Sequence, residues 1–277
     1  MNLILTKIFK YFTQIFLYLT MIFSLNTNSS ANNDKNDTTK YIPIDVEQIK
    51  VENKAFNIGE KLTFSIDYGP IQAGVATMSV VDTINFKNRK CYQVVSEASS
   101  SKSFSIIFKV EDRIESIIDS KGIFSWKIEK HLHEGNYDSD NYYEFDYKNN
   151  IAFSDKDTVK ISQIFQDALS SLFYLRTQKL EIGKALNVPH FDNGKIYNLE
   201  IKVLKKEKIK VKTGIYETIL VEPLMKSIGV FKHGGNIRVW VTNDERKMPV
   251  KMTTKIYLGS IGLGNIGANL IEHKGFD

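Results

Sequence analysis

Apolar and polar side chains alternate along much of the chain beyond residue 60, which is typical of β-strands with one buried face. In the clearest example, Leu62, Phe64 and Ile66 alternate with polar residues before a Gly-Pro pair that favours a turn. The same alternation predicts further strands near residues 76–80, 104–110, 124–132, 143–147, 151–153, 197–203, 237–241 and 249–258.

Short turn sequences separate several of these strands. Asp192 to Lys195 reads Asp-Asn-Gly-Lys, and Asn-Gly is the strongest short signal for a β-hairpin. Further turns are predicted at Asn149-Asn150, Lys212-Thr213-Gly214 and Asn243–Arg246. Because no rhythm of alternating strands and helices occurs, we expect an antiparallel sheet rather than a parallel one.

One segment, from about Gln163 to Gln178, has the period of a helix instead. We expect Ser162 to be its N-cap, and Leu169 and Leu172 to be buried against the sheet. The apolar stripe of this segment comprises Ile164, Phe165, Ala168, Leu169, Leu172, Phe173 and Leu175.

So wide a stripe needs a cover, and the concave face of a curved sheet provides one. The predicted fold is therefore mainly β: a curved antiparallel sheet, a roll or half-barrel, packed around one amphipathic helix near residues 163–178. We expect a single domain over residues 55–272, ending in a Gly-rich tail (259–277) that is frayed.

The N-terminus has the layout of a secretory signal peptide over residues 1–31. Lys7 and Lys10 precede an apolar run over residues 11–25, and Ser29 and Ala31 supply small residues for a cut that leaves Asn32 first. The alternative is an uncleaved anchor helix, although the run is shorter than the roughly 20 residues that span a bilayer. Residues 32–54 are polar and predict a flexible leader.

Composition narrows the function classes. The 277 residues carry 37 basic and 32 acidic side chains, a net charge of +5 that is too mild to indicate a nucleic-acid partner. The only cysteine, Cys91, excludes an internal disulfide and a thiolate zinc cage, and without a sequence-adjacent His and acid it does not indicate a catalytic thiol. Apolar residues at 42% suffice for a core.

A Gly-x-Gly-x-x-Gly pattern spans Gly262 to Gly267. A dinucleotide site would need a helix, a further strand and an acidic residue about 20 positions later. The chain ends at Asp277, so we reject a nucleotide and expect no cofactor.

His131, His133 and Glu134 form the segment that most resembles a metal or acid–base site. Residues two apart on a strand share a face, so both imidazoles could reach one ion. A third ligand is not evident, and we favour a polar, outward strand face without metal.

Two charged groups have simpler explanations. Arg113 and Glu115 share a face opposite Asp112, and we expect ion pairs with neighbouring strands. A basic stripe, interrupted by glutamates, is interpreted as solvated hairpin faces and edge protection rather than a nucleic-acid site. Its lysines are Lys202, Lys205, Lys206, Lys208, Lys210 and Lys212.

Several stretches together resemble the DUF3108 family of exported bacterial proteins. The first is Phe56–Gly74, FNIGEKLTFSIDYGPIQAG, and the others follow in the family's order. They are VEDRIES (110–116), EGNY (134–137), QDALSSLFYLRT (166–177) and GGNIRVWVTNDERKMPVKM (234–252). The resemblance implies a β-rich envelope domain and supplies no catalytic residues, because the family's function is not characterised.

We therefore expect a non-catalytic module of the periplasm or cell surface that binds or carries an apolar or polymeric envelope component. The alternatives are an envelope hydrolase using the region His131–Glu134, and a structural partner in an outer-membrane assembly. Catalytic residues stay unassigned, and we expect no membrane span once the signal is removed. Either an apolar ligand or an envelope protein is the expected partner.

Overall fold

The computed structural model describes residues 43–106, 108–226, 237–258 and 261–275. In these ranges one antiparallel sheet of 14 strands dominates, with two short α-helices and a 3-10 turn. The helical elements are η1 (Val46–Gln48), α2 (Lys102–Ser105) and α3 (Ala168–Thr177). The strands are β1 (Lys61–Tyr68), β2 (Ile71–Phe86), β3 (Arg89–Ser100), β4 (Val110–Asp119), β5 (Ser125–Glu134), β6 (Tyr137–Asp146), β7 (Ile151–Phe153), β8 (Thr158–Lys160), β9 (Ala185–Asp192), β10 (Lys195–Val211), β11 (Gly214–Lys226), β12 (Arg238–Thr242), β13 (Pro249–Leu258) and β14 (Ile261–Lys274).

Hairpins connect most neighbouring strands, as the turn sequences predicted. The strands lie in the order β8 to β1, then β14 to β9, so β8 and β9 form the two edges. The first and last strands meet in the middle, where β1 pairs with β14 from Lys61↔Lys274 to Tyr68↔Ile266.

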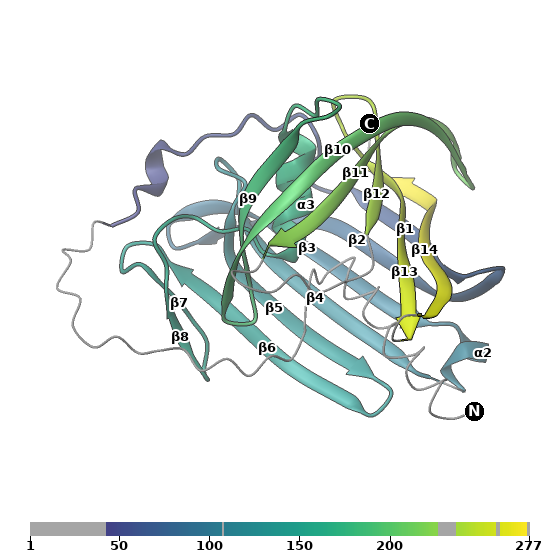
Figure 1. Ribbon diagram of the computed structural model, residues 1–277. Coiled ribbons are helices and arrows are strands. Elements are labelled where there is room, and N and C mark those ends of the chain that lie inside the picture. Colours follow the sequence, from purple (N-terminus) through teal and green to yellow (C-terminus); the bar gives the residue numbers. More distant parts are fainter. Residues whose placement is uncertain (1–42, 107, 227–236, 259–260, 276–277) are drawn as a thin grey trace.

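The sheet curves around α3, which lies against β4 and β9 (Figure 1). Leu169 and Phe173 of the helix are fully buried together with Phe64 and Phe191 from the sheet and Phe124 from the loop before β5. These contacts confirm the predicted architecture of a curved antiparallel sheet around one helix. They also confirm that Leu169 is buried, whereas Leu172 is only partly buried.

The helix begins five residues later than predicted, and Ser162 is not its N-cap. Asp167 is, because its carboxylate accepts the backbone N–H of Ser170 at 2.8 Å while the Ser170 hydroxyl accepts the N–H of Asp167. The residues before it are extended, since Gln166 forms a parallel bridge with His190 on edge strand β9. The apolar residues just before the helix therefore pack on the core from an extended backbone. Their spacing in the sequence does not distinguish this arrangement from a continuation of the helix.

Two further predictions are wrong. The alternation over residues 104–110 does not form a continuous strand: α2 occupies part of it, and β4 starts only at Val110. A hydrogen bond between the hydroxyls of Ser100 and Ser105, which lie 2.7 Å apart, stabilises the turn at this point.

The prediction of a flexible leader over residues 32–54 is also wrong from residue 43 onward. There, Ile44 donates its N–H to the carbonyl of Tyr147 at 3.1 Å. Residues 1–31 and 32–42 lie outside the described part of the chain.

The C-terminal segment is not a frayed tail. Residues 261–274 form β14, which pairs with β1 on one side and β13 on the other. The Gly-x-Gly-x-x-Gly pattern therefore lies inside a strand and not in a turn before a helix. Pairing on both sides offsets the backbone entropy that glycine loses, and the local composition does not reveal such distant partners.

Candidate functional site

Three turns at one end of the sheet expose large apolar side chains. They are the β1–β2 hairpin, the β3–β4 connection that contains α2, and the β5–β6 hairpin (Figure 1). Ile71, Ile106 and Tyr137 are exposed to 56%, 87% and 53% respectively. We call these three residues, with the partly buried Phe104 and Phe108, the apolar tip.

Backbone contacts hold the three turns together. The N–H of Ser101 donates to the carbonyl of Ala73 at 2.7 Å, which joins the β3–β4 connection to β2. On the other side, Gly135 donates to the carbonyl of Lys109 at 2.8 Å. Phe108 lies over Gly135, where a Cβ would be only 2.6 Å from the ring. The apolar tip is therefore one surface built from three chain segments.

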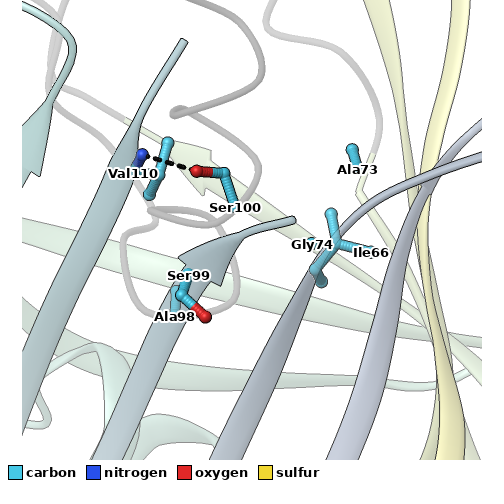
Figure 2. A pocket seen from close by; sticks show the side chains of 7 residues that line it. All are labelled: Ile66, Ala73, Gly74, Ala98, Ser99, Ser100 and Val110. Carbon is cyan, nitrogen blue, oxygen red and sulfur yellow. Dashed lines mark hydrogen bonds between the residues drawn. The ribbon is translucent and has the colours of Figure 1, made fainter. Parts of the chain in front are cut away.

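Beneath the tip, the ends of β1 to β4 enclose a cavity of only about 10 Å³ (Figure 2). The Ser100 hydroxyl accepts the N–H of Val110 at 3.0 Å beside it, and a Cβ at Gly74 would collide with the Ser99 carbonyl oxygen at 2.4 Å. Its lining consists of Ile66, Ala73, Gly74, Ala98, Ser99, Ser100 and Val110. A space of this size accommodates one water molecule at most, so the apolar surface available to a partner lies on the outside of the tip.

The charges around the tip are mixed. Lys102 and Lys109 flank the exposed isoleucine, and Lys109 pairs with Glu111 at 2.8 Å near the surface. Farther inside, Asp112 is buried and accepts the backbone N–H of His133 at 3.0 Å. Burial raises the pKa of the Asp112 carboxyl to about 7.

A larger and more polar hollow, of about 480 Å³, lies at the C-terminal end of α3. Lys50, Lys54, Glu245 and Lys247 line it together with Arg176. The Arg176 guanidinium is completely buried and is held by Glu60 through two hydrogen bonds of 2.6 and 2.8 Å. This bidentate ion pair joins α3 to the start of β1. A structural role therefore accounts for Arg176 without a ligand.

The histidines of the predicted metal-like segment face outward on β5. His131 contacts Asp140 at 2.7 Å and Glu129 at 3.1 Å, and His133 contacts Asp138 at 2.7 Å. Glu134 is buried on the opposite face, so alternation separates it from both imidazoles. Across the described residues, no three His, Cys, Asp or Glu side chains are placed to hold a metal ion.

The charged residues of β4 behave as the alternation predicted. Arg113 bridges Glu97 at 2.9 Å and Glu115 at 2.8 Å on the exposed face, while Asp112 lies on the other. Cys91 is fully buried, and burial together with Asp119 raises its pKa to about 12. A thiol with so high a pKa carries almost no thiolate at neutral pH.

A buried polar cluster at the start of α3 was missed in the sequence. Ser171 and His190 lie 3.0 Å apart, and Asp167 accepts the Ser116 hydroxyl at 2.5 Å. Burial and the nearby Lys130 lower the pKa of His190 to about 3. All these side chains are at least 96% buried, so a substrate does not reach them. No local signal could have revealed the pair, because its members are 19 residues apart on a helix and an edge strand.

Fold and surface together define a mainly β protein with one open antiparallel sheet around a helix and an apolar tip at one end. The family model described as "Protein of unknown function (DUF3108)" matches residues 63–263, and the chain belongs to this family. A comparison with curated proteins gives no match. The described helices are all too short and polar to cross a bilayer.

Three solved structures are similar to this chain. A β-barrel-like protein of the DUF1849 family from Brucella abortus has a TM-score of 0.53 and 10% identity, over 80% of this chain and 100% of that one. A proposed exported protein with a YmcC-like fold from Bacteroides fragilis has a TM-score of 0.37 and 10% identity, over 80% and 98% of the two chains. For a proposed lipoprotein from Parabacteroides distasonis the values are 0.36 and 11%, over 79% and 97%. The first likeness supports the fold and nothing beyond it.

Proposed function

We propose that this protein is an exported, non-catalytic module of the cell envelope that binds an apolar component through the apolar tip. The observation that carries the proposal is Ile106, which is 87% exposed at the centre of a surface fixed by three hydrogen-bonded turns. Removing an isoleucine side chain completely from water is favourable by roughly 1.5–3 kcal/mol. A partner that covers Ile106 would therefore gain binding free energy of this order.

An outward surface suits the packing better than an internal cavity. The helix and the inner side chains of the sheet fill the interior, and the cavity beneath the tip is too small for an acyl chain. The partner therefore lies on the tip, with Ile71 and Tyr137 on either side of the central isoleucine. An acyl chain of an envelope lipid has the matching chemistry.

The alternative of an envelope hydrolase has less support. Acid–base catalysis requires positioned groups in a cleft that substrate enters. His131 and His133 are bound to surface carboxylates on a strand face, and Ser171 and His190 are enclosed by the core. A binding role explains the exposed tip without assigning chemistry to either group.

Export and domain extent belong to the same proposal. The basic start, the apolar run and the small residues before Asn32 support a cleaved signal peptide over residues 1–31. We infer one folded unit over residues 55–272, which the pairing of β1 with β14 supports. A cleaved signal peptide implies that the protein resides in the periplasm or on the cell surface.

A fluorescent derivative of palmitic acid tests the proposal. We expect the protein to bind it, and Ile106→Ser to weaken binding about tenfold, since most of one isoleucine's burial energy is lost. Ile182→Ser is the matched control, because Ile182 is also exposed, to 47%, on a loop outside the tip. Equal binding by Ile106→Ser and the unmodified protein, or an equal loss in the control, would refute the proposal.

A further inference from the structure

The hairpin of β10 and β11 extends beyond both neighbouring strands. Strand β9 pairs with β10 only up to Lys202, and β12 pairs with β11 only from Thr218 onward. From Lys208 to Val211 and from Gly214 to Glu217, β10 and β11 pair only with each other, as a two-stranded ribbon that arches past the end of β12 towards β13 and β14 (Figure 1). A shift of register between Val203 and Lys205 precedes the ribbon, and such irregularities bend strands.

One face of this ribbon is fixed to the protein. Ile209, Val211 and Tyr216 are partly buried against the core. The Trp240 indole N–H donates to the carboxylate of Glu207 at 2.8 Å, and the Tyr216 hydroxyl contacts His273 at 3.4 Å. The orientation of the other face is therefore set by packing.

That other face is basic and exposed. Lys206, Lys208 and Lys210 occupy every second position, which spaces them about 6.8 Å apart, and Lys212 continues the row into the turn. Ile215, opposite Lys210, is 68% exposed on the same face. We call these five residues the lysine ribbon.

Carboxylates lie near two of the four lysines. Lys208 pairs with Glu217 at 3.1 Å, near the surface, and Lys212 lies close enough to Glu272 to help lower the pKa of that carboxyl. Lys206 and Lys210 form no ion pair with any described residue. Charged side chains, lysines especially, protect exposed strand edges from aggregation. Edge protection accounts for the lysines but not for Ile215, an apolar side chain that is 68% exposed among them.

We propose that the lysine ribbon docks on a membrane surface that contains anionic phospholipid. Lysines near such a surface attract its negative headgroups, and an apolar side chain among them enters the interface. The exposed Ile215 favours a lipid surface over a soluble anionic polymer, which offers no apolar phase. The ribbon packs near His273, close to the start of β1, whereas the apolar tip lies beyond Tyr68 at the other end of that strand. The two surfaces are therefore separate, and this inference does not depend on the proposed function.

Vesicle sedimentation tests the inference. It uses the processed protein, purified from the cells that export it. The vesicles contain either phosphatidylcholine alone or phosphatidylcholine with about 40% phosphatidylglycerol. Each lysine near an anionic surface strengthens binding about fivefold, so Lys206→Gln with Lys210→Gln should weaken binding to the anionic vesicles about 25-fold. The matched control is Lys121→Gln with Lys148→Gln, two exposed lysines elsewhere that change the net charge equally.

Further comparisons decide between the outcomes. We expect Ile215→Ser to weaken vesicle binding without affecting binding to dextran sulfate, and circular dichroism checks that each variant is folded. Equal loss in the control pair, or binding of neutral and anionic vesicles alike, would overturn the inference. So would a ribbon that binds dextran sulfate more tightly than vesicles and is indifferent to Ile215→Ser, because that identifies a polymer site.

Discussion

Asp112 gives the folded protein a pH dependence that one substitution can isolate. Its side chain is 96% buried, and one carboxylate oxygen has no hydrogen-bond partner in the described structure. Burial raises its pKa from 3.8 to about 7, despite the N–H of His133 and the charge on that imidazole, which act in the opposite direction. Across this range the folded protein keeps a proton that the unfolded chain has released.

Stability should therefore fall as the pH rises from about 4 to 7, and stay reduced above that. A rise of the pKa from 3.8 to about 7 corresponds to a loss of about 4 kcal/mol at pH 8 and of only about 1–2 kcal/mol at pH 5. Asp112→Asn cannot ionise, and its amide oxygen can still accept the N–H of His133. The variant should be more stable than the original protein, and the gain should be about 2–3 kcal/mol larger at pH 8 than at pH 5.

Urea denaturation at the two pH values measures this difference. Asp155→Asn, at an exposed carboxylate, is the control and should change stability by less than about 0.5 kcal/mol at both pH values. A stability gain for Asp112→Asn that is the same at pH 5 and pH 8 would show that the carboxyl is not held protonated.

Three further predictions concern packing and processing. Leu169→Ala should lower the free energy of unfolding by about 2–5 kcal/mol in urea denaturation, because Leu169 is fully buried, whereas Leu204→Ala at an exposed site should cost little. A small effect at Leu169 would contradict a helix packed inside the sheet. Deleting Gly262 to Asp277 removes β14 and exposes the facing edges of β1 and β13, so circular dichroism should detect no cooperative unfolding; an unchanged melting temperature would mean that the strand is dispensable. N-terminal sequencing of the exported protein should begin at Asn32, and an intact N-terminus in the membrane fraction would favour an anchor.

Local patterns predicted the elements whose stability is local. Alternation located β1 because Leu62, Phe64 and Ile66 all face the core, and Asn193-Gly194 located the β9–β10 hairpin. The parity of β5 also placed His131 and His133 on the outer face. In each case one strand or turn contains the whole signal.

The errors arise where distant contacts decide the structure. Phe165 is apolar and close to the helix, but its neighbour Gln166 is held extended by β9. Gly267 belongs to a strand because β1 and β13 pair with it, and Ser171 meets His190 only after the sheet has curled. The apolar tip is likewise invisible in one dimension, since Ile71, Ile106 and Tyr137 come from three separate turns.

Native mass spectrometry of the protein isolated from its own envelope tests the binding role of the apolar tip most directly. The proposed function predicts a population with the added mass of an apolar molecule. That population should be lost in Ile106→Ser and retained in Ile182→Ser. A protein that carries no such molecule, or one whose bound molecule persists in Ile106→Ser, would contradict the assignment of binding to the apolar tip.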